Sequence, residues 1–169
     1  FCFMLEIDDF FLLPEFPRVR LLLIGEGSLR RDLEVLVKKL HLENKITFLG
    51  TIPHDKLADY YYMSDLFVRP ALSEGLGTVF LEAMAAGVPV VATPIGGIVD
   101  FLKDTQTGIF VIPDNPESIK EGMKKILVNP SLAETLRENG RKLVRKNYLW
   151  GDIAVKMEDL FRKQIYSKI

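Results

Sequence analysis

The chain of 169 residues has room for one well-buried domain, and two domains of ordinary size would not fit. Apolar residues make up 48% of it and charged residues 27%, which is typical of a folded globular protein and excludes extensive disorder. Its 22 basic and 23 acidic residues give a formal net charge of -1, so no broad positive field can attract a nucleic-acid backbone. We expect a single domain over residues 1–169 that binds no nucleic acid.

Neither the apolar runs nor the N-terminal residues indicate a membrane-spanning or secreted protein. The longest apolar runs, such as Leu21–Ile24, are far shorter than the ~20 residues that cross a bilayer. The first residues, FCFMLEIDDFF, have no basic region and carry three acidic side chains, so they are not a signal peptide. The single cysteine, Cys2, cannot form an internal disulfide, which agrees with a reducing compartment. We expect a cytoplasmic protein that could associate with a membrane only peripherally.

Short runs rich in Leu and β-branched residues alternate with longer segments of helical period, which is typical of βα units and a parallel sheet. Buried strands are predicted at residues 20–25, 45–50, 65–70, 89–93 and 108–112. Helices bounded by Gly and Pro are predicted at 29–40, with Ser28 as N-cap, and at 55–63, 79–86, 116–127, 130–147 and 152–167. The sequence therefore predicts an open α/β sheet with helices on both faces.

The stretch from Arg69 to Pro94 places a Gly-rich loop between a strand and a helix. Doubly wound folds bind ligands at such a junction, because the helix N-terminus directs backbone N–H groups and the positive end of its dipole into the crevice beyond the strands. Gly75 and Gly77, on either side of Leu76, let the backbone approach an anion closely, and Thr78 is expected to be the N-cap. The candidate diphosphate contacts are the backbone N–H groups of Gly77, Thr78 and Val79.

Two carboxylates flank this loop, Glu74 before it and Glu82 eight residues later within the following helix. Carboxylates accept hydrogen bonds from sugar hydroxyls, and a nucleotide sugar carries hydroxyls on both sides of its diphosphate. Two separated carboxylates match that layout. The same residues have simpler interpretations: Glu82 could only stabilise the helix through its dipole, by ~0.5 kcal/mol, and the two glycines could only form a tight turn.

The sequence EGLGTVFLEAMAAGVPVVAT, residues 74–93, resembles the donor-site block of the group 1 glycosyltransferases, a large family of GT-B fold. That family pairs two glutamates eight apart around an EGFG-like loop and continues with EAMAxGxPVVAT. The flanking segments LLLIGEGSLRRDLE, FLGTIPHDKLADYYYMSDLFVRP, IGGIVDFL and TGIFVIPDN are similar to the family in order and spacing. The resemblance implies a Rossmann-like doubly wound parallel sheet, the C-terminal, nucleotide-sugar-binding half of a GT-B glycosyltransferase.

The resemblance also implies a reaction, the transfer of a sugar from a nucleoside diphosphate sugar to an acceptor hydroxyl with retention at the anomeric carbon. Glu74 would face the hydroxyls of the donor sugar as the catalytic residue, and Glu82 would hold the ribose. The nucleobase would lie near Phe48–Thr51 and Arg69–Ala71. The family commonly needs no metal or other cofactor, in agreement with the absence of an Asp-x-Asp motif, and UDP, GDP and ADP sugars all fit its pattern. The loop that binds the donor would comprise Gly75, Leu76, Gly77, Thr78 and Val79.

Two parts of the family pattern are missing from this sequence. The first strand, and a turn that carries an Arg and a Lys against the diphosphate, should precede residue 1, and Phe3–Leu13 resembles the helix that follows them. The N-terminal Rossmann-like acceptor domain, the expected partner of this half, is also missing, as is an initiator Met. We therefore expect a fragment that binds its donor weakly and transfers little sugar by itself. Its last helix should expose Leu160, Phe161 and Ile165 where the partner half would pack.

Two alternative functions stay open. A GT-B fold epimerase or phosphorylase would need acid–base groups near the sugar or a pyridoxal-binding lysine, and neither pattern is visible. A non-catalytic nucleotide-sugar-binding module would share the whole pattern, and a second Rossmann-like half in the same polypeptide would distinguish an enzyme from it.

Overall fold

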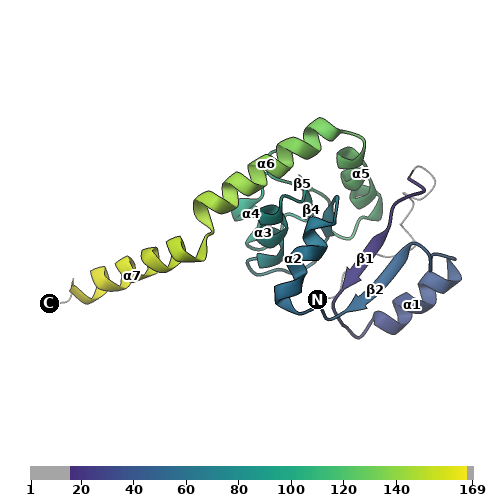
Figure 1. Cartoon of the computed structure of the whole chain (residues 1–169), viewed down its shortest axis with the longest axis horizontal. Coiled ribbons are helices and arrows are strands. Elements are labelled where there is room, and N and C mark those ends of the chain that lie inside the picture. The colour runs from purple at the N-terminus through teal and green to yellow at the C-terminus, as the bar shows by residue number, and fades with distance from the viewer. Residues whose placement is uncertain (1–15, 167–169) are drawn as a thin grey trace.

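The structure, a computed structural model, describes residues 16–166 as alternating strands and helices (Figure 1). The helix predicted at Phe3–Leu13 and the N-terminal residues tested as a signal peptide lie outside this range. In chain order the elements are β1 (Leu21–Ile24), α1 (Arg30–Lys39), β2 (Ile46–Gly50), α2 (His54–Tyr62), β3 (Phe67–Arg69), α3 (Thr78–Ala86), β4 (Val90–Ala92), α4 (Ile98–Phe101), β5 (Ile109–Phe110), α5 (Pro116–Leu127), α6 (Pro130–Asn147) and α7 (Trp150–Tyr166).

Helices α5 and α6 begin and end at the residues that the sequence predicts. Each begins at a proline directly after an asparagine N-cap. The Asn115 side chain accepts a hydrogen bond from the Ser118 N–H at 2.8 Å, and Asn129 accepts one from the Leu132 N–H at 3.0 Å. These bonds satisfy N–H groups that the helix itself cannot pair, and a proline in the first turn has no N–H to satisfy. All the predicted strands are also present, each somewhat shorter than predicted.

Two predicted N-caps are wrong by one residue. The N-cap of α1 is Leu29 rather than Ser28, and no side chain caps that helix. The N-cap of α3 is Gly77 rather than Thr78, because Gly77 adopts a left-handed φ of 77° that turns the loop directly into the helix. Thr78 is consequently the first helical residue. The short helix α4 was not predicted, since four residues are too few to show a helical period.

All strand pairs are parallel, as predicted, but they are divided between two sheets. One sheet has the order β1-β2, and the other has the order β3-β4-β5. Within residues 16–166, β1 and β3 form no ladder with each other, and a cavity of about 920 Å³ lies between them. The parallel α/β architecture is confirmed, and the division of its sheet is a feature that the sequence did not reveal.

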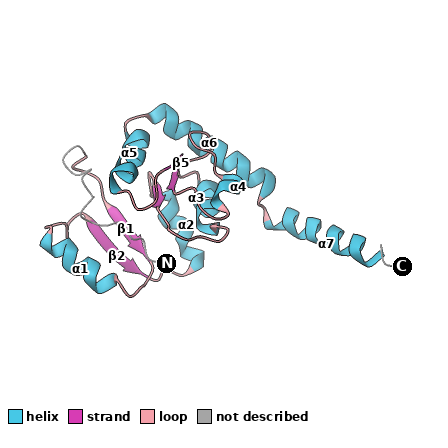
Figure 2. Ribbon diagram, turned by 180° about the vertical axis from the view of Figure 1, so that it is seen from behind, coloured by secondary structure: helices cyan, strands magenta, loops and turns pink. Residues whose placement is uncertain are grey.

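Helices cover both faces of the three-stranded sheet, which makes the fold doubly wound (Figure 2). Val68 of β3 packs into a core shared with Met123 of α5. Phe67, the preceding residue, points to the opposite face and packs edge-to-face on Phe80 of α3, with ring centroids 5.5 Å apart. This alternation is expected, because successive side chains of a strand point to opposite faces. A smaller core joins α1 to β1 and β2 through Leu23, Val37 and Ile46.

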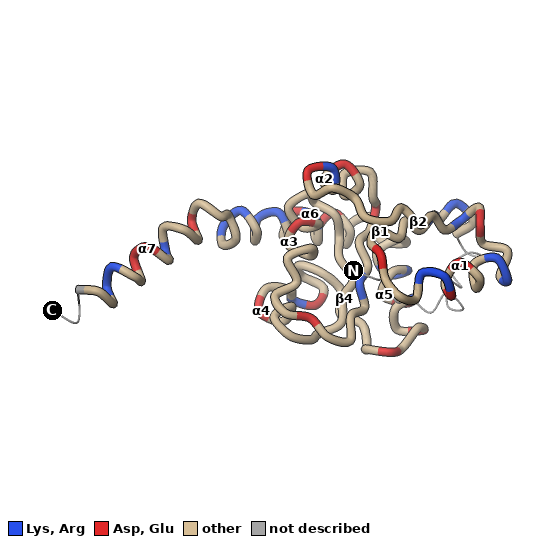
Figure 3. The backbone as a smooth tube through the Cα atoms, turned by 90° about the horizontal axis from the view of Figure 1, so that it is seen from below, with Lys and Arg blue, Asp and Glu red and all other residues tan. Residues whose placement is uncertain are grey.

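Helix α7 projects from the rest of the molecule as an arm (Figure 1). Its apolar side chains Leu160, Phe161 and Ile165 are 62%, 62% and 61% exposed, which confirms their predicted exposure. Basic and acidic residues are interspersed along this helix and over the body of the molecule (Figure 3). None of the described helices is both long and apolar enough to span a bilayer.

Candidate functional site

Two loops meet beyond the carboxyl ends of β3 and β4. The Gly97 N–H, in the loop after β4, donates to the Gly75 carbonyl at 2.7 Å. Gly96 has a φ of 52°, and a Cβ atom there would lie 1.9 Å from the backbone oxygen of Glu74. Only glycine fits so close to another backbone. The loop of residues 70–77 is therefore fixed against the loop that follows β4.

Helix α3 begins at this pair of loops, and no side chain caps its N-terminus. The Phe80 N–H donates to the Gly77 carbonyl at 3.0 Å. The N–H groups of Thr78 and Val79 come earlier in the first turn, where the helix has no carbonyl that can accept from them. A Cβ atom on Gly77 would lie 2.9 Å from the Phe80 ring, so this position also needs glycine. Open N–H groups and the positive end of the helix dipole together form a place that can hold an anion.

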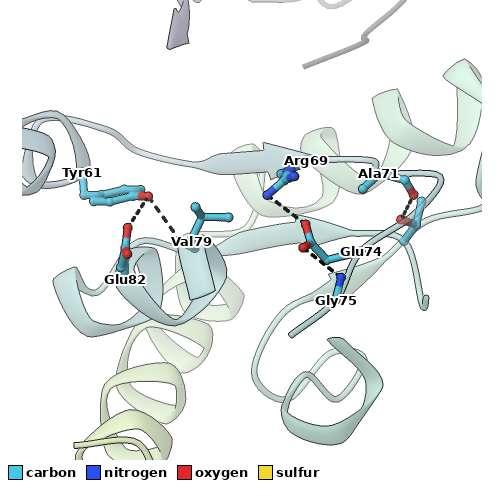
Figure 4. A network of polar contacts seen from close by, with 8 residues as sticks. Tyr61, Arg69, Ala71, Glu74, Gly75, Val79 and Glu82 are labelled. Atoms are coloured by element: carbon cyan, nitrogen blue, oxygen red, sulfur yellow. Dashed lines mark hydrogen bonds and ion pairs between the residues drawn. The ribbon is translucent and has the colours of Figure 1, made fainter. Parts of the chain in front are cut away.

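Glu74 is held at the mouth of this site by two contacts (Figure 4). Its Oε2 lies 2.9 Å from Arg69 Nη1, and both side chains are only 13% exposed. Its Oε1 accepts a hydrogen bond from the Gly75 N–H at 3.1 Å. Oε2 is buried and accepts no hydrogen bond from the described residues, so the ion pair with Arg69 is its polar contact. These two contacts fix the orientation of the carboxylate at the start of the loop.

Glu82 lies one helical turn beyond the start of α3 and is bound by residues of α2. The Tyr61 hydroxyl donates to Glu82 Oε2 at 3.2 Å and approaches the Val79 carbonyl at 3.4 Å, while His54 Nε2 lies 3.4 Å from Glu82 Oε1. Burial, together with the nearby Glu82 carboxylate, raises the pKa of the Tyr61 phenol well above its ordinary value. The phenol therefore stays protonated and donates. With 31% of its side chain exposed, Glu82 also remains accessible to a ligand.

The structure brings the predicted site residues together at the start of α3. Glu74 and Glu82 lie on either side of Val79 and have separate partners (Figure 4). The remaining predicted residues lie between the two glutamates in the chain, and one of them, Leu76, is 50% exposed. The others are Gly75, Gly77, Thr78 and Val79. The two carboxylates are therefore separated, as the sequence predicts.

Sequence reasoning missed the partners of both glutamates. Arg69 was assigned only to the nucleobase edge, and the structure shows that it also pairs with Glu74. A charged residue at the carboxyl end of an apolar strand was the available signal for this role. Tyr61 and His54 carried no such signal, because they are 21 and 28 residues from Glu82 and only the fold brings them close.

The predicted nucleobase region at Phe48–Thr51 lies at the same edge, beyond β2. The Gly25 N–H donates to the Gly50 carbonyl at 2.8 Å, so the ends of β1 and β2 are tied together. The Arg30 guanidinium lies 5.8 Å from the centre of the Phe48 ring and pairs with Glu34 at 2.8 Å. Among residues 16–166, no group of three or more His, Cys, Asp or Glu side chains is arranged to hold a metal ion.

Comparison with known proteins adds a family and a fold. Residues 7–143 match the family model described as "Glycosyl transferases group 1". An uncharacterized glycosyltransferase of Methanocaldococcus jannaschii, MJ1607, is 36% identical over 143 residues, which are 85% of this chain and 37% of that protein. A GDP-mannose-dependent alpha-(1-6)-phosphatidylinositol monomannoside mannosyltransferase of Mycobacterium tuberculosis is 30% identical over 149 residues, 84% of this chain and 39% of that one. The chain spans less than half the length of these relatives.

Solved structures support the same fold. Sucrose-phosphate synthase from Thermosynechococcus elongatus superposes with a TM-score of 0.82 at 34% identity, over 92% of this chain and 41% of that one. Anabaena HepE, solved in complex with UDP and glucose, superposes with a TM-score of 0.81 at 21% identity, over 87% of this chain and 41% of that one. At that identity the second likeness concerns the fold alone.

Proposed function

Because this chain belongs to the group 1 glycosyltransferase family, we propose that it is the donor-binding half of a retaining glycosyltransferase. The proposed reaction transfers a sugar from a nucleoside diphosphate sugar to an acceptor hydroxyl, with retention at the anomeric carbon. Since the chain spans 37% of its M. jannaschii relative, we propose that the other half of the full-length enzyme binds the acceptor. The isolated chain would then bind donor weakly and transfer little sugar.

The observation that carries the proposal is the position of Glu74, whose carboxylate is held by the Arg69 guanidinium and the Gly75 N–H in the loop that leads into α3. Oε1 accepts one hydrogen bond, from the Gly75 N–H, and a carboxylate oxygen can accept a second from a donor on a ligand. A sugar hydroxyl is such a donor, and an ionised acceptor makes the hydrogen bond about twice as strong as a neutral one. We assign Glu74 to the hydroxyls of the donor sugar, as the catalytic residue of this half.

The diphosphate is assigned to the N-terminus of α3. The N–H groups of Gly77, Thr78 and Val79 would donate to its oxygens, and the helix dipole adds about half a positive charge. Gly75 and Leu76 would border the same oxygens from the loop. Residues 70–82 contain no Lys or Arg, so within this segment the contact would rest on main-chain N–H groups alone.

Glu82 is assigned to the ribose hydroxyls. Tyr61 and His54 would orient its carboxylate, and its exposed part would receive the ribose. The nucleobase would lie near Phe48–Thr51 and Arg69–Ala71, beyond β2 and β3. One relative is named for GDP-mannose and one structural neighbour was solved with UDP, so the identity of the nucleotide must be measured.

We propose further that the transfer needs no metal or other cofactor and that it takes place in the cytoplasm. The lack of an Asp-x-Asp motif supports the first point. The single cysteine and the absence of a bilayer-spanning helix among residues 16–166 are compatible with the second.

Ligand-observed NMR on the 169-residue chain tests the proposed function. UDP, GDP, ADP and their hexose conjugates would each be added with and without Mg²⁺, and Glu82→Ala serves as the matched variant. We expect one nucleotide to bind weakly, without a requirement for Mg²⁺, and to lose its signal with the variant. Binding that survives Glu82→Ala unchanged, or that requires Mg²⁺, contradicts the assignment of the ribose or of the metal-free diphosphate.

A further inference from the structure

Within residues 16–165, the buried core contains a single polar side chain, that of Thr93. It directly follows β4, whose residues are also fully buried. A hydroxyl group in such a position needs a partner, because burial of a polar group without a hydrogen bond costs free energy. A valine would fill nearly the same volume without this requirement, so the hydroxyl points to a specific contact.

The Thr93 hydroxyl donates to the Ala71 carbonyl at 2.5 Å (Figure 4). The ladder between β3 and β4 ends at Arg69, so this bond lies just beyond the last paired residues of the two strands. Ala71 is near the start of the loop after β3, three residues before Glu74. The Thr93 side chain therefore extends the contact between the two strands into the loop that carries Glu74.

A second contact holds the same loop on the other side of Glu74. The Gly97 N–H donates to the Gly75 carbonyl at 2.7 Å, and Gly97, like Thr93, comes from the segment after β4. Leu72, which lies between the two contacts, is 63% exposed, so its side chain does not anchor the loop in the core. Glu74 is therefore carried by a short segment that residues after β4 hold at both ends.

A threonine side chain suits this role physically. A β-branched side chain has few χ1 rotamers, so a buried threonine holds its hydroxyl in a fixed direction. With none of its surface exposed, Thr93 also keeps water away from the hydrogen bond, and a bond in such surroundings is stronger than one at the surface. Loss of the hydroxyl would leave the Ala71 carbonyl without this donor.

We infer that Thr93 is a positioning residue for Glu74. Its hydroxyl fixes Ala71 against the end of β4 and thereby determines where the Glu74 carboxylate lies relative to the N-terminus of α3. Thr93 itself is fully buried and out of reach of a bound donor, so it acts through the loop. The anchoring of the loop follows from the geometry alone, whereas its consequence for sugar transfer rests on the proposed function.

Two substitutions separate anchoring of the loop from simple core packing. Thr93→Val keeps the branched shape and removes the hydroxyl, whereas Thr93→Ser keeps the hydroxyl and removes a methyl group. If Thr93 only filled the core, valine would be tolerated and serine would not. Anchoring of the loop predicts the opposite order.

Thr107→Val is the matched control. The Thr107 hydroxyl also donates to a backbone carbonyl, that of Phe101, at 3.3 Å. Thr107 precedes β5, so it lies at the amino edge of the parallel sheet, opposite the edge of the candidate site. This substitution removes a hydroxyl of the same kind at a distance from the loop that carries Glu74.

Hydrogen exchange by NMR on the ligand-free 169-residue chain is the first measurement. We expect Thr93→Val to speed exchange of the Gly75 and Gly97 amides by about tenfold, because local opening of the loop becomes easier. Thr93→Ser and Thr107→Val should keep the rates of the parent chain. Equal rates in Thr93→Val and the parent, or faster exchange in Thr93→Ser than in Thr93→Val, overturn the inference. Acceleration by the same factor at Val91, in the middle of β4, also overturns it, because that result reports a loss of stability of the whole fold.

Steady-state kinetics of the full-length enzyme measures the consequence for sugar transfer. Thr93→Val should lower kcat by about tenfold with a smaller change in the donor Kd, because a displaced Glu74 is misaligned with the reacting sugar. Thr93→Ser should retain most of the parent kcat. An unchanged kcat in Thr93→Val overturns the positioning role. A parent enzyme that transfers no sugar would instead refute the proposed function, and the exchange measurement, which needs no donor, would still decide whether Thr93 anchors the loop.

Discussion

The carboxylate of Glu74 lies 2.9 Å from the guanidinium of Arg69, and the nearer oxygen, Oε2, is buried without a hydrogen bond. The ion pair compensates the charge of the carboxylate, and Oε1, which accepts one hydrogen bond from the Gly75 N–H, has a second lone pair that can accept from a ligand. A site built in this way holds its acceptor in position before the ligand arrives, which lowers the entropy lost on binding.

Removal of Arg69 should destabilise the chain because it leaves the Glu74 carboxylate largely buried without its charge partner. We expect Arg69→Ala to lower the free energy of unfolding by about 2 kcal/mol. Arg69→Ala combined with Glu74→Ala should lose less than the sum of the two single variants. Urea denaturation of all four chains measures the coupling, and strictly additive losses would contradict a direct interaction.

The two glutamates should have different effects on the full-length enzyme. Glu74→Ala is expected to lower turnover by about a hundredfold with a smaller change in donor affinity, because we assign Glu74 to the reacting sugar. Glu82→Ala is expected to weaken donor binding by about tenfold with a smaller change in turnover, because the ribose lies away from the reacting bond. Steady-state kinetics combined with donor titration separates the two, and indistinguishable defects would defeat these roles.

Tyr61→Phe tests whether the phenol orients Glu82. Loss of the 3.2 Å hydrogen bond should weaken nucleotide binding by about fivefold, whereas Tyr62→Phe, on a side chain 72% exposed, should leave it unchanged. Isothermal titration or NMR titration with the nucleotide measures both variants. Equal affinities for the two variants would show that Tyr61 only packs.

Stability at alkaline pH should depend on Tyr61 as well. The pKa of this phenol is raised in the folded chain, so the folded state retains a proton that the unfolded state releases above about pH 10. The contribution of the Tyr61 phenol to the free energy of unfolding is therefore fully present below about pH 10. It is lost as the pH rises towards the pKa of this phenol in the folded chain. Denaturant unfolding between about pH 8 and 11 should show a steeper loss for the parent chain than for Tyr61→Phe, and parallel curves would refute the assignment.

Gly96 should be far less tolerant of substitution than Gly75. A Cβ at Gly96 would overlap the backbone of the neighbouring loop, and its φ of 52° disfavours other residues. We expect Gly96→Ala to cost about 3 kcal/mol of stability. A Cβ at Gly75 meets no atom within 4 Å, so Gly75→Ala should change stability little. Thermal unfolding measures the stability of both variants. A similar loss of stability in Gly96→Ala and Gly75→Ala would contradict this prediction.

Local signals explain which parts of the fold could be predicted from the sequence. An asparagine followed by a proline marks the start of α5 and of α6, and both predicted helices have the observed bounds. Gly77 carries a weaker signal, because a glycine between a loop and a helix can be either the last loop residue or the N-cap of the helix. The φ of 77° identifies Gly77 as the N-cap, and a Cβ there would lie 2.9 Å from the Phe80 ring.

Contacts between distant residues explain what could not be predicted. The Tyr61–Glu82 hydrogen bond joins α2 to α3, and no local pattern in either helix specifies it. The division between β1 and β3 is likewise invisible to periodicity, which identifies strands without identifying their neighbours. Resemblance to the family located the block of residues 74–93, and only the structure supplied the partners that hold its carboxylates.

The end of α3 that we assign to the diphosphate offers main-chain amides, so the exposed side chains there can be replaced without loss of the proposed contacts. Leu76 is half exposed and Thr78 is exposed, so replacement of either leaves the amides in place. Under the proposed function, substitutions at these positions change the surface beside the donor and keep the amides that we assign to its diphosphate. Diversification of donor preference on this scaffold should accordingly be concentrated in such side chains, with the glycines that shape the backbone kept fixed.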